Sequence, residues 1–262
     1  MKHRLEEHPS VHLTWMSYIR DFGRYLRTSG YKDAYVLSGE FKAKMVRTKP
    51  YLLSSTEIDA FFDAASRLRM KSPWEWEARC FFGLMHSCGL RTCEVRRLSV
   101  DNVDLNNGYI EILCSKGNRS RRLAITDEVA AMIAECDCAT TDIFGAGRKA
   151  FFVTATGNPV SPCSVGVTFN HIWDIAGLPR QKDGKRPRPY DLRHHFAYAN
   201  IERWAGEGKN IEAMLPYLAK YMGHATFEST YYYVHTSPDF MAGYADMVRD
   251  CESVIPEVGF DA

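Results

Sequence analysis

Four short segments, far apart in the chain, carry side chains that could together bind and attack one phosphodiester. The segments are Gly89-Leu90-Arg91-Thr92-Cys93-Glu94, Lys116 between two strand-like runs, Asp191-Leu192-Arg193-His194, and Gly223-His224 with Tyr233 nine residues after the histidine. A guanidinium group keeps its charge and donates paired hydrogen bonds, so Arg91 and Arg193 could hold the two non-bridging oxygens of a phosphate. Donors placed in this way stabilise the charge that develops during attack at phosphorus by about 3 kcal/mol each.

The nucleophile would be one of three consecutive tyrosines, Tyr231, Tyr232 and Tyr233. A phenol is a weak nucleophile with a pKa of about 10, and nearby positive charge lowers that pKa and stabilises the phenolate. Consecutive residues of a helix point about 100° apart, so only one of the three is expected to face the phosphate. The phosphotyrosyl bond would keep the energy of the phosphodiester. Rejoining would then require neither ATP nor a metal ion, and we expect no cofactor.

Two further side chains could complete this chemistry. Lys116 could protonate the leaving 5′ oxygen, and His224 could hydrogen-bond the phosphate. A lysine in a turn is more often simply exposed to solvent, and a histidine after a glycine is equally often a capping residue. A lone arginine most often forms a surface salt bridge. The prediction therefore depends on the whole set of residues and not on any one of them.

The hydrophobic pattern predicts a mainly α-helical fold with a small antiparallel β-sheet, an α+β protein. Residues 109–113 and 122–125 alternate as strands do, and a turn signal at 115–120 joins them in a hairpin that carries Lys116. Before the hairpin, helices are indicated over 13–29, 54–65, 73–89 and 92–98. From residue 127 onward the pattern is again helical, with further helices over 161–177, 191–201, 215–223, 230–234 and 239–248.

Three of these helices would carry segments of the proposed site. Thr92 is expected to cap the short helix that includes Glu94, and Asp191 is expected to cap the helix that includes Arg193. Leu215-Pro216 is expected to begin the last of the three.

Pro50 indicates a boundary between a short helical N-terminal part, residues 1–48, and a large domain, residues 49–262. The formal net charge is only +1, so the position of the basic residues matters more than their number. Basic runs lie beside the proposed site residues and could follow a DNA phosphate backbone, although a single run is usually a solvated surface. The residues that we expect to contact DNA are Arg119, Arg121, Arg122, Lys185, Arg186 and Arg188.

Composition argues against several classes of protein. Apolar residues make up 45% of the 262 residues, which is typical of a globular chain, and no apolar run is long enough to span a bilayer. The charged N-terminus does not favour a secretory signal, and we expect no membrane partner. The eight cysteines include no Cys-x-x-Cys pair, so we expect reduced thiols in the cytoplasm and no zinc site. Cys80, Cys88, Cys93 and Cys114 lie in patterns that indicate burial.

The four segments, in this order and at this spacing, resemble the tyrosine recombinase (phage integrase) family over roughly residues 50 to 250. The resemblance implies the catalytic-domain fold of that family for residues 49–262, preceded by a short, truncated core-binding region at residues 1–48. It also implies that Glu94 is an acidic residue that supports the site. The nine-residue step from the histidine selects the last of the three tyrosines as the nucleophile. The catalytic residues that the resemblance implies are Arg91, Lys116, Arg193, His224 and Tyr233.

The second arginine motif departs from the family pattern. It often reads His-x-x-Arg, and here Tyr190 occupies the histidine position. A phenol titrates poorly near pH 7, so the usual proton-shuttling imidazole is in doubt, and slow or context-dependent cleavage is a hypothesis. Tyr190 could still hydrogen-bond the phosphate. His194 could substitute for the missing imidazole, although we expect it to lie on a different helical face.

The resemblance implies a site-specific recombinase that cuts double-stranded DNA at paired recombination sites and leaves a 3′-phosphotyrosine and a free 5′-hydroxyl. Such an enzyme would be a homo-tetramer on DNA, weakly associated or monomeric without it, and cytoplasmic with the nucleoid. The short N-terminal part resembles truncated recombinases of mobile elements, so an accessory recombinase could supply the missing DNA clamp. The apolar face at 239–248 could dock on a neighbouring subunit or pack on its own domain.

Two other functions stay open on the same residues. The tyrosine at the histidine position and the short N-terminal part favour a DNA-binding regulator or architectural protein with weakened catalysis. A relaxing topoisomerase would share the chemistry but would act without paired sites. Covalent trapping on nicked DNA separates an enzyme from a binding protein, and strand exchange between two sites separates a recombinase from a topoisomerase.

Overall fold

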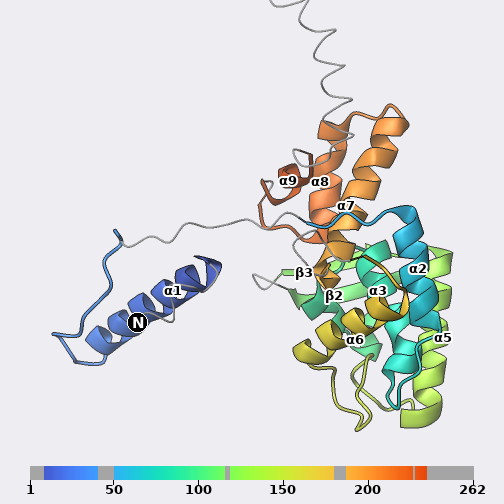
Figure 1. Ribbon diagram of the computed structural model, residues 1–262, viewed down its shortest axis with the longest axis horizontal. Helices are drawn as coiled ribbons and strands as arrows, with labels where there is room; N and C mark the ends of the chain where they lie inside the picture. The colour runs from blue at the N-terminus through green and yellow to red at the C-terminus, as the bar shows by residue number, and fades with distance from the viewer. Residues whose placement is uncertain (1–8, 41–49, 116–118, 180–186, 227, 235–262) are drawn as a thin grey trace, which may run out of the picture. The chain divides into compact units, whose positions relative to one another are not determined.

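The computed structural model (Figure 1) describes residues 9–40, 50–115, 119–179, 187–226 and 228–234. The chain divides into two compact units, Met1–Lys49 and Pro50–Ala262, and each is described by itself.

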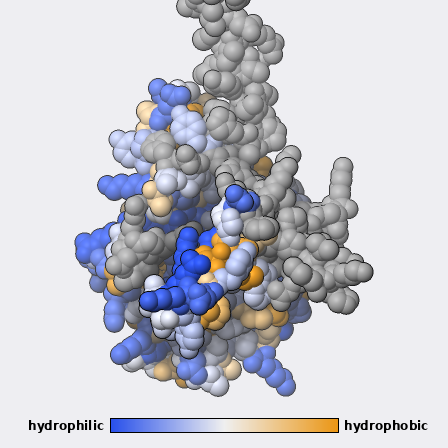
Figure 2. Space-filling view, turned by 90° about the vertical axis from the view of Figure 1, so that its left-hand side faces the viewer, coloured by the Kyte–Doolittle hydropathy of each residue, from blue (hydrophilic) through white to orange (hydrophobic). Residues whose placement is uncertain are grey.

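Within the described ranges, no helix is both long enough and apolar enough to cross a membrane. The described residues on the face shown in Figure 2 mix hydrophilic and hydrophobic types, with a small hydrophobic group bordered by hydrophilic residues.

Helix α1 of the first unit spans Pro9–Thr28, where the sequence predicted 13–29. It is followed by Gly30, whose φ of 100° is readily adopted only by glycine. The chain then returns along the helix, and the Arg27 side chain donates a hydrogen bond to the Ala34 carbonyl at 2.9 Å. The prediction of a helix stopped by this glycine is confirmed.

The second unit contains a three-stranded antiparallel sheet in the order β1-β2-β3. Its strands span Val103–Asp104, Tyr109–Ser115 and Arg119–Ala124. The two predicted strands are confirmed as β2 and β3, whereas β1 was not predicted because two residues are too few to show an alternating pattern. Lys116, which follows β2, lies outside the described residues.

Helices make up most of the second unit, and α3 packs against α2, α5 and α7 (Figure 1). The core around α3 is aromatic, and Phe82 meets Phe61 and Phe169 edge to face, with ring centroids 5.6 and 5.5 Å away. The fold is therefore mainly α with a small antiparallel sheet, as predicted. The described helices of this unit are α2 (Ser55–Ser66), α3 (Trp74–Ser87), α4 (Thr92–Arg96), η2 (Val100–Asn102), α5 (Asp127–Phe144), α6 (Pro162–Ile175), α7 (Pro189–Gly206), α8 (Ile211–Met222) and α9 (Glu228–Val234).

Local start signals correctly located α2 and α6. Ser54 Oγ accepts from the Glu57 N–H at 3.3 Å, and the Glu57 carboxylate accepts from the Ser54 N–H at 2.8 Å, which is the predicted capping box. Ser161 Oγ likewise accepts from the Ser164 N–H at 3.1 Å at the start of α6. The predicted helix at 239–248 lies outside the described residues.

Two helix starts beside the site differ from the prediction. The N-cap of α4 is Arg91 and not Thr92, and α7 begins two residues before Asp191, after the N-cap Arg188. In both helices an acidic residue at the third position, Glu94 or Asp191, accepts from the backbone N–H of the N-cap residue, at 2.9 and 2.7 Å. The carboxylate in the first turn thus stabilises the start without a side-chain cap.

The start of α8 was also predicted wrongly. This helix begins at Ile211, and Pro216 lies inside it instead of in its first turn. The cap is Asn210, whose side-chain oxygen accepts from the Ala213 N–H at 3.1 Å. An asparagine N-cap outweighed the proline signal, since the missing N–H of one proline does not prevent a helix that is anchored upstream.

Helices α7, α8 and α9 share a second hydrophobic core at one end of the unit (orange in Figure 1). Tyr233, the candidate nucleophile, is a buried member of this second core. The buried members of this cluster are Ala197, Tyr198, Ile201, Trp204, Leu215, Leu218, Met222 and Tyr233.

Two of the four cysteines that were predicted to be buried, Cys80 and Cys88, are buried, but Cys93 is exposed. The side chain of Cys114 lies outside the described residues. Helix α4 buries Glu94 and Val95, and this leaves Cys93 at the surface.

Candidate active site

The first site segment leaves the end of α3 in a turn at Gly89, whose φ is 59°. A side chain there would overlap the ring of Phe196, so both the backbone conformation and the packing require glycine. The turn places Arg91 at the N-cap of α4. The Glu94 carboxylate accepts from the Arg91 N–H at 2.9 Å and from its Nη1 at 2.7 Å. Glu94 therefore fixes both the backbone and the guanidinium group of Arg91.

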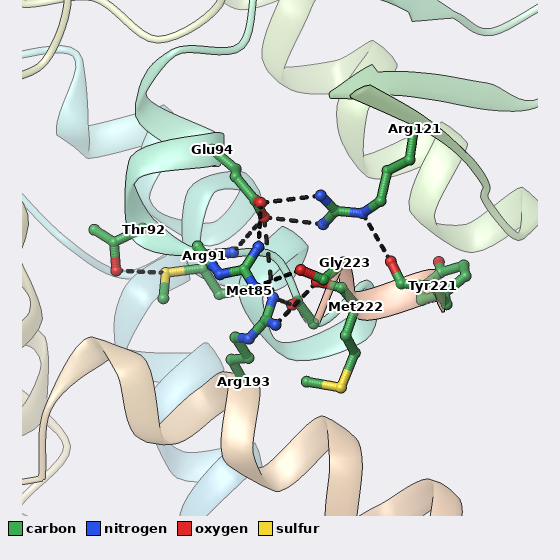
Figure 3. Close-up of polar contacts among 10 residues, drawn as sticks. Met85, Arg91, Thr92, Glu94, Arg121, Arg193, Tyr221, Met222 and Gly223 are labelled. Carbon is green, nitrogen blue, oxygen red and sulfur yellow. Dashed lines mark hydrogen bonds and ion pairs between the residues drawn. The ribbon is translucent and has the colours of Figure 1, made fainter. Parts of the chain in front are cut away.

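Glu94 is the common partner of three arginines (Figure 3). Its side chain is 2% exposed, and it accepts two hydrogen bonds from Arg121, at 2.9 and 3.0 Å. Arg193 Nη1 lies 3.9 Å from Glu94 Oε2. Three guanidinium groups around one carboxylate give the cluster an excess of positive charge, which suits an anionic ligand. Within the described part of the chain, no group of three or more His, Cys, Asp or Glu side chains could hold a metal ion.

The end of α8 orients the same arginines. The last carbonyls of a helix have no partner within the helix and carry partial negative charge. Sequence reasoning did not identify these acceptors, although the helix stop at Gly223 was a signal that could have located them. Each of three successive carbonyls accepts from a different arginine: Tyr221 from Arg121 Nε at 2.8 Å, Met222 from Arg193 Nη2 at 2.9 Å, and Gly223 from Arg91 Nη2 at 2.7 Å.

Replacement of Gly223 tests this arrangement. Its φ is 68°, and a Cβ would lie 2.7 Å from Nη1 of Arg121, which Glu94 and Tyr221 hold in place. We expect Gly223→Ala to lower the free energy of unfolding by about 1–3 kcal/mol in chemical denaturation. Gly208→Ala is the matched control, because Gly208 also has a φ of 68° but no atom within 4 Å of the added Cβ. Equal losses in the two variants would contradict crowding at the arginine cluster.

Arg193 is completely buried, with 0% of its side chain exposed. Nη1 donates to the Gly89 carbonyl and Nη2 to the Met222 carbonyl, so the side chain joins the ends of α3 and α8. Its Nε has no hydrogen-bond partner among the described residues. Burial lowers the pKa of Arg193 from its ordinary value, although an arginine keeps its charge at neutral pH.

His224 joins α8 to α9. Its backbone N–H donates to the Ala219 carbonyl at 2.9 Å, and its Nδ1 lies 2.7 Å from Thr230 Oγ1. Burial lowers the pKa of His224 to about 3, with further contributions from Arg193 and Arg91. The imidazole is therefore neutral at pH 7 and can act as a hydrogen-bonding group without a charge of its own.

Tyr233 lies in α9 and is 2% exposed. Its hydroxyl oxygen is 3.0 Å from His194 Nδ1, and its ring stacks with the ring of His224 at a centroid distance of 6.0 Å. Tyr231 is 36% exposed, and the side chain of Tyr232 lies outside the described residues. Of the two tyrosines whose side chains are described, Tyr233 is the one that lies against the histidines of the site.

The expectation that His194 lies on a different helical face was wrong. Tyr190 and His194 are four residues apart, so they are neighbours on one face of α7, with ring centroids 4.8 Å apart. His194 contacts Tyr190 with its ring and Tyr233 with its Nδ1. Burial lowers the pKa of His194 to about 4, and the charges of Arg188 and Arg193 contribute. This imidazole is also neutral at pH 7.

The residues predicted to contact DNA lie in different environments. Arg121 is part of the arginine cluster, where it holds Glu94, instead of lying on the surface. Arg122 is exposed on β3, and its Nε lies 2.5 Å from a carboxylate oxygen of Glu111. Arg188 is exposed at the start of α7. The predicted DNA contacts whose side chains lie outside the described residues are Arg119, Lys185 and Arg186. The same holds for Lys116, which was predicted to be catalytic.

Known proteins resemble this chain over most of its length. The model of the phage integrase family matches residues 52–239. The candidate integrase/recombinase y4rE of Sinorhizobium fredii is 30% identical over 230 residues, which cover 87% of this chain and 73% of the relative. The tyrosine recombinase XerC of Escherichia coli is 26% identical over 231 residues, which cover 88% of this chain and 71% of XerC.

Solved structures show the same fold at lower identity. The recombinase XerH, bound to its difH substrate in a pre-cleavage complex, aligns with a TM-score of 0.67 at 18% identity. The alignment covers 89% of this chain and 64% of XerH, so the chain spans less than two thirds of that protein. The lambda integrase tetramer bound to a Holliday junction aligns with a TM-score of 0.59 at 16% identity, over 83% of this chain and 57% of that one.

Proposed function

This chain belongs to the phage integrase family of tyrosine recombinases, and we propose on that premise that it is a site-specific recombinase that cuts and rejoins DNA through a 3′-phosphotyrosyl intermediate. Its second unit has the fold of tyrosine recombinase catalytic domains, as predicted. The observation that carries the proposal is the arginine cluster at the end of α8 beside Tyr233. The ring of His224 stacks on that tyrosine, and Arg193 and Arg91 are close enough to His224 to lower its pKa.

In the proposed mechanism, Arg91 and Arg193 bind the non-bridging oxygens of the scissile phosphate. Arg121 does not touch the phosphate; it holds Glu94, which in turn orients Arg91. The free Nε–H of Arg193 is a donor without a hydrogen-bond partner among the described residues. Because the side chain of Arg193 has no exposed surface, a bound phosphate has to displace neighbouring groups before it can reach this donor.

Tyr233 would attack the phosphorus, and the phosphorus–O5′ bond would break as the tyrosyl bond forms. Lys116, from the segment between β2 and β3, would protonate the leaving 5′ oxygen. The 5′-hydroxyl of a partner strand would then attack the phosphotyrosine and release the enzyme. No external energy source enters this scheme, because each step exchanges one phosphodiester for another.

The proposed partner is double-stranded DNA with specific recombination sites, on which the protein would form a homo-tetramer in the cytoplasm. Support comes from the solved relatives, among which XerH is bound to its difH substrate and lambda integrase is a tetramer on a junction. Without DNA we expect a monomer or a weakly associated form. Unit Met1–Lys49 would serve as a short DNA clamp, with an accessory recombinase as a further partner.

The test is covalent trapping on nicked duplexes that tile the chromosomal DNA on either side of the gene. A nick beside the cleavage point lets the short 5′-hydroxyl fragment diffuse away, so the protein stays attached. We expect an adduct that survives denaturing electrophoresis and a phosphotyrosine at Tyr233 in mass spectrometry. An adduct at another residue would contradict the assignment of the nucleophile, and relaxation of supercoiled DNA without strand exchange would indicate a topoisomerase.

The second candidate is a DNA-binding regulator or architectural protein with weakened catalysis. The complete burial of Arg193 favours it, because both terminal nitrogens of that side chain are bonded to backbone carbonyls. A gel shift on the tiled duplexes without any covalent adduct would support this candidate over the enzyme.

A further inference from the structure

We propose that His194 is the catalytic base that removes the phenolic proton of Tyr233. The supporting geometry is direct, because His194 Nδ1 lies 3.0 Å from the Tyr233 hydroxyl oxygen, within hydrogen-bond distance of the atom that would attack. The inference rests on the proposed function, since it assigns a role in that reaction.

The base would lie one helical turn beyond the usual position of the imidazole. Tyr190 occupies the position where the family pattern often has histidine, and His194 follows it by four residues on the same face of α7. A step of four residues along a helix moves a side chain by about 6 Å with little rotation. An imidazole at this position therefore still faces α9 and its tyrosine.

Other histidines near the site are less suited to this role. The ring of His224 stacks with the Tyr233 ring at an interplanar angle of 18°, and its Nδ1 lies 2.7 Å from Thr230 Oγ1. His195 stacks with His86 of α3 at a centroid distance of 5.1 Å. The imidazole within hydrogen-bond distance of the phenol is that of His194, whose Nδ1 points at the hydroxyl oxygen.

The charge state of His194 fits proton acceptance. Burial and the neighbouring arginines lower its pKa to about 4, so at pH 7 the ring is neutral and Nδ1 can accept a proton when Nε2 carries the other. A bound phosphate would add negative charge near these arginines and bring the pKa back toward its ordinary value. The charged and titratable groups that face His194 are Arg188 at the N-cap of α7, Tyr190 and Arg193 of α7, His224 after α8 and Tyr233 of α9.

The step is balanced without any further reagent. As the bond between the Tyr233 oxygen and phosphorus forms, the phenolic proton moves to His194 Nδ1 and the phosphorus–O5′ bond breaks. The O5′ atom leaves with a proton from Lys116 in the proposed mechanism. On rejoining, the attacking 5′-hydroxyl gives its proton to Lys116 as O5′ bonds to phosphorus, and the tyrosyl oxygen leaves phosphorus and recovers its proton from the His194 imidazolium.

The experiment compares His194→Asn with the parent chain in single-turnover cleavage of the tiled nicked duplexes. An asparagine amide places a hydrogen-bonding group close to the position of Nδ1 but cannot take up a proton near neutral pH. We expect cleavage to be slower by about 10²–10³-fold, with DNA binding in gel shifts and thermal unfolding unchanged. His194→Gln fills the same space with a longer amide and is a second variant in case the first does not fold.

The matched control is His195→Gln, which alters the neighbouring histidine on the side of His86. Its cleavage rate is expected to stay within about threefold of the parent. If His194 had a purely structural role, His194→Asn would cleave at the rate of the parent, because its amide would still form the hydrogen bond.

The pH profile and a modified substrate separate a base from a positioning group. In the parent, the cleavage rate should fall in acid as His194 becomes protonated, at a pH between its lowered pKa of about 4 and the ordinary value of about 6.5, because the bound phosphate raises this pKa again. In His194→Asn this acid limb should disappear, and the rate should rise with pH toward the phenol range. A bridging 5′-phosphorothiolate, whose sulfur leaves without a proton, should rescue Lys116→Ala but not His194→Asn.

Three outcomes would overturn the inference. Equal cleavage by the parent and His194→Asn would overturn it alone and leave the proposed function intact. Rescue of His194→Asn by the phosphorothiolate would also overturn it, since the residue would then act on the leaving group. A parent chain that binds the duplexes without forming an adduct would overturn the proposed function, and this inference with it.

Discussion

Tyr233→Phe is expected to abolish the covalent protein–DNA adduct while leaving the fold and DNA binding nearly unchanged. The substitution removes the one oxygen that would attack phosphorus, so no slower route through the same residue remains. The ring stays in the second core, where it packs against Tyr198 and His224. Loss of the hydroxyl contact to His194 should cost about 1 kcal/mol of unfolding free energy. Denaturing electrophoresis on nicked duplexes, gel shifts and urea unfolding measure the three quantities.

The matched control for this variant is Tyr231→Phe. Tyr231 lies two residues away on the same short helix and is 36% exposed, so loss of its hydroxyl should leave adduct formation unchanged. An adduct of undiminished yield from Tyr233→Phe, or its loss from Tyr231→Phe, would show that another tyrosine is the nucleophile.

Glu94→Gln is expected to lower the free energy of unfolding by about 3–5 kcal/mol, because it removes the buried carboxylate that three arginines share. The amide can still accept the Arg91 N–H, but it cannot neutralise the guanidinium charges. Cleavage should fall by about 10²-fold as well, since Arg91 and Arg121 lose the group that fixes their orientation. Urea denaturation and single-turnover cleavage measure the two effects.

The control for Glu94→Gln is Glu111→Gln. Glu111 pairs with Arg122 across β2 and β3, but the two side chains are 29% and 66% exposed. Its replacement should change stability by less than about 1 kcal/mol. The difference between the two variants should persist at about 1 M salt, where screening removes surface interactions but affects a buried pair much less. A similar small loss in both variants would contradict the central role of Glu94.

The parts of the site that the sequence revealed are those set by local spacing. Glu94 follows Arg91 by three residues, and one helical turn is enough to bring that carboxylate to the N-cap backbone. The mainly helical fold and the β2–β3 hairpin also follow from periodicity and turn residues within a few positions of each other. These contacts require no knowledge of how distant segments pack.

The role of Arg121 could not be predicted in that way. It lies in a basic run that resembles a solvated surface, and its partners are 27 and 100 residues away in the chain, at Glu94 and Tyr221. Only the packing of β3 against the ends of α4 and α8 turns this arginine inward. The position of His194, in contrast, was a local error, because residues four apart on a helix share a face.

The carbonyls at the end of α8 make the three arginines interdependent. Tyr221, Met222 and Gly223 are consecutive residues at the end of one helix, so a displacement of that helix end would shift all three acceptors together. The guanidinium groups of Arg91, Arg121 and Arg193 would then change orientation together, and an arrangement with only some of them in place would be rare. A helix terminus of this kind would make phosphate binding cooperative. A phosphate in the correct position would be bound by Arg91 and Arg193 together, with Arg121 holding Glu94, and a displaced phosphate would be bound by neither.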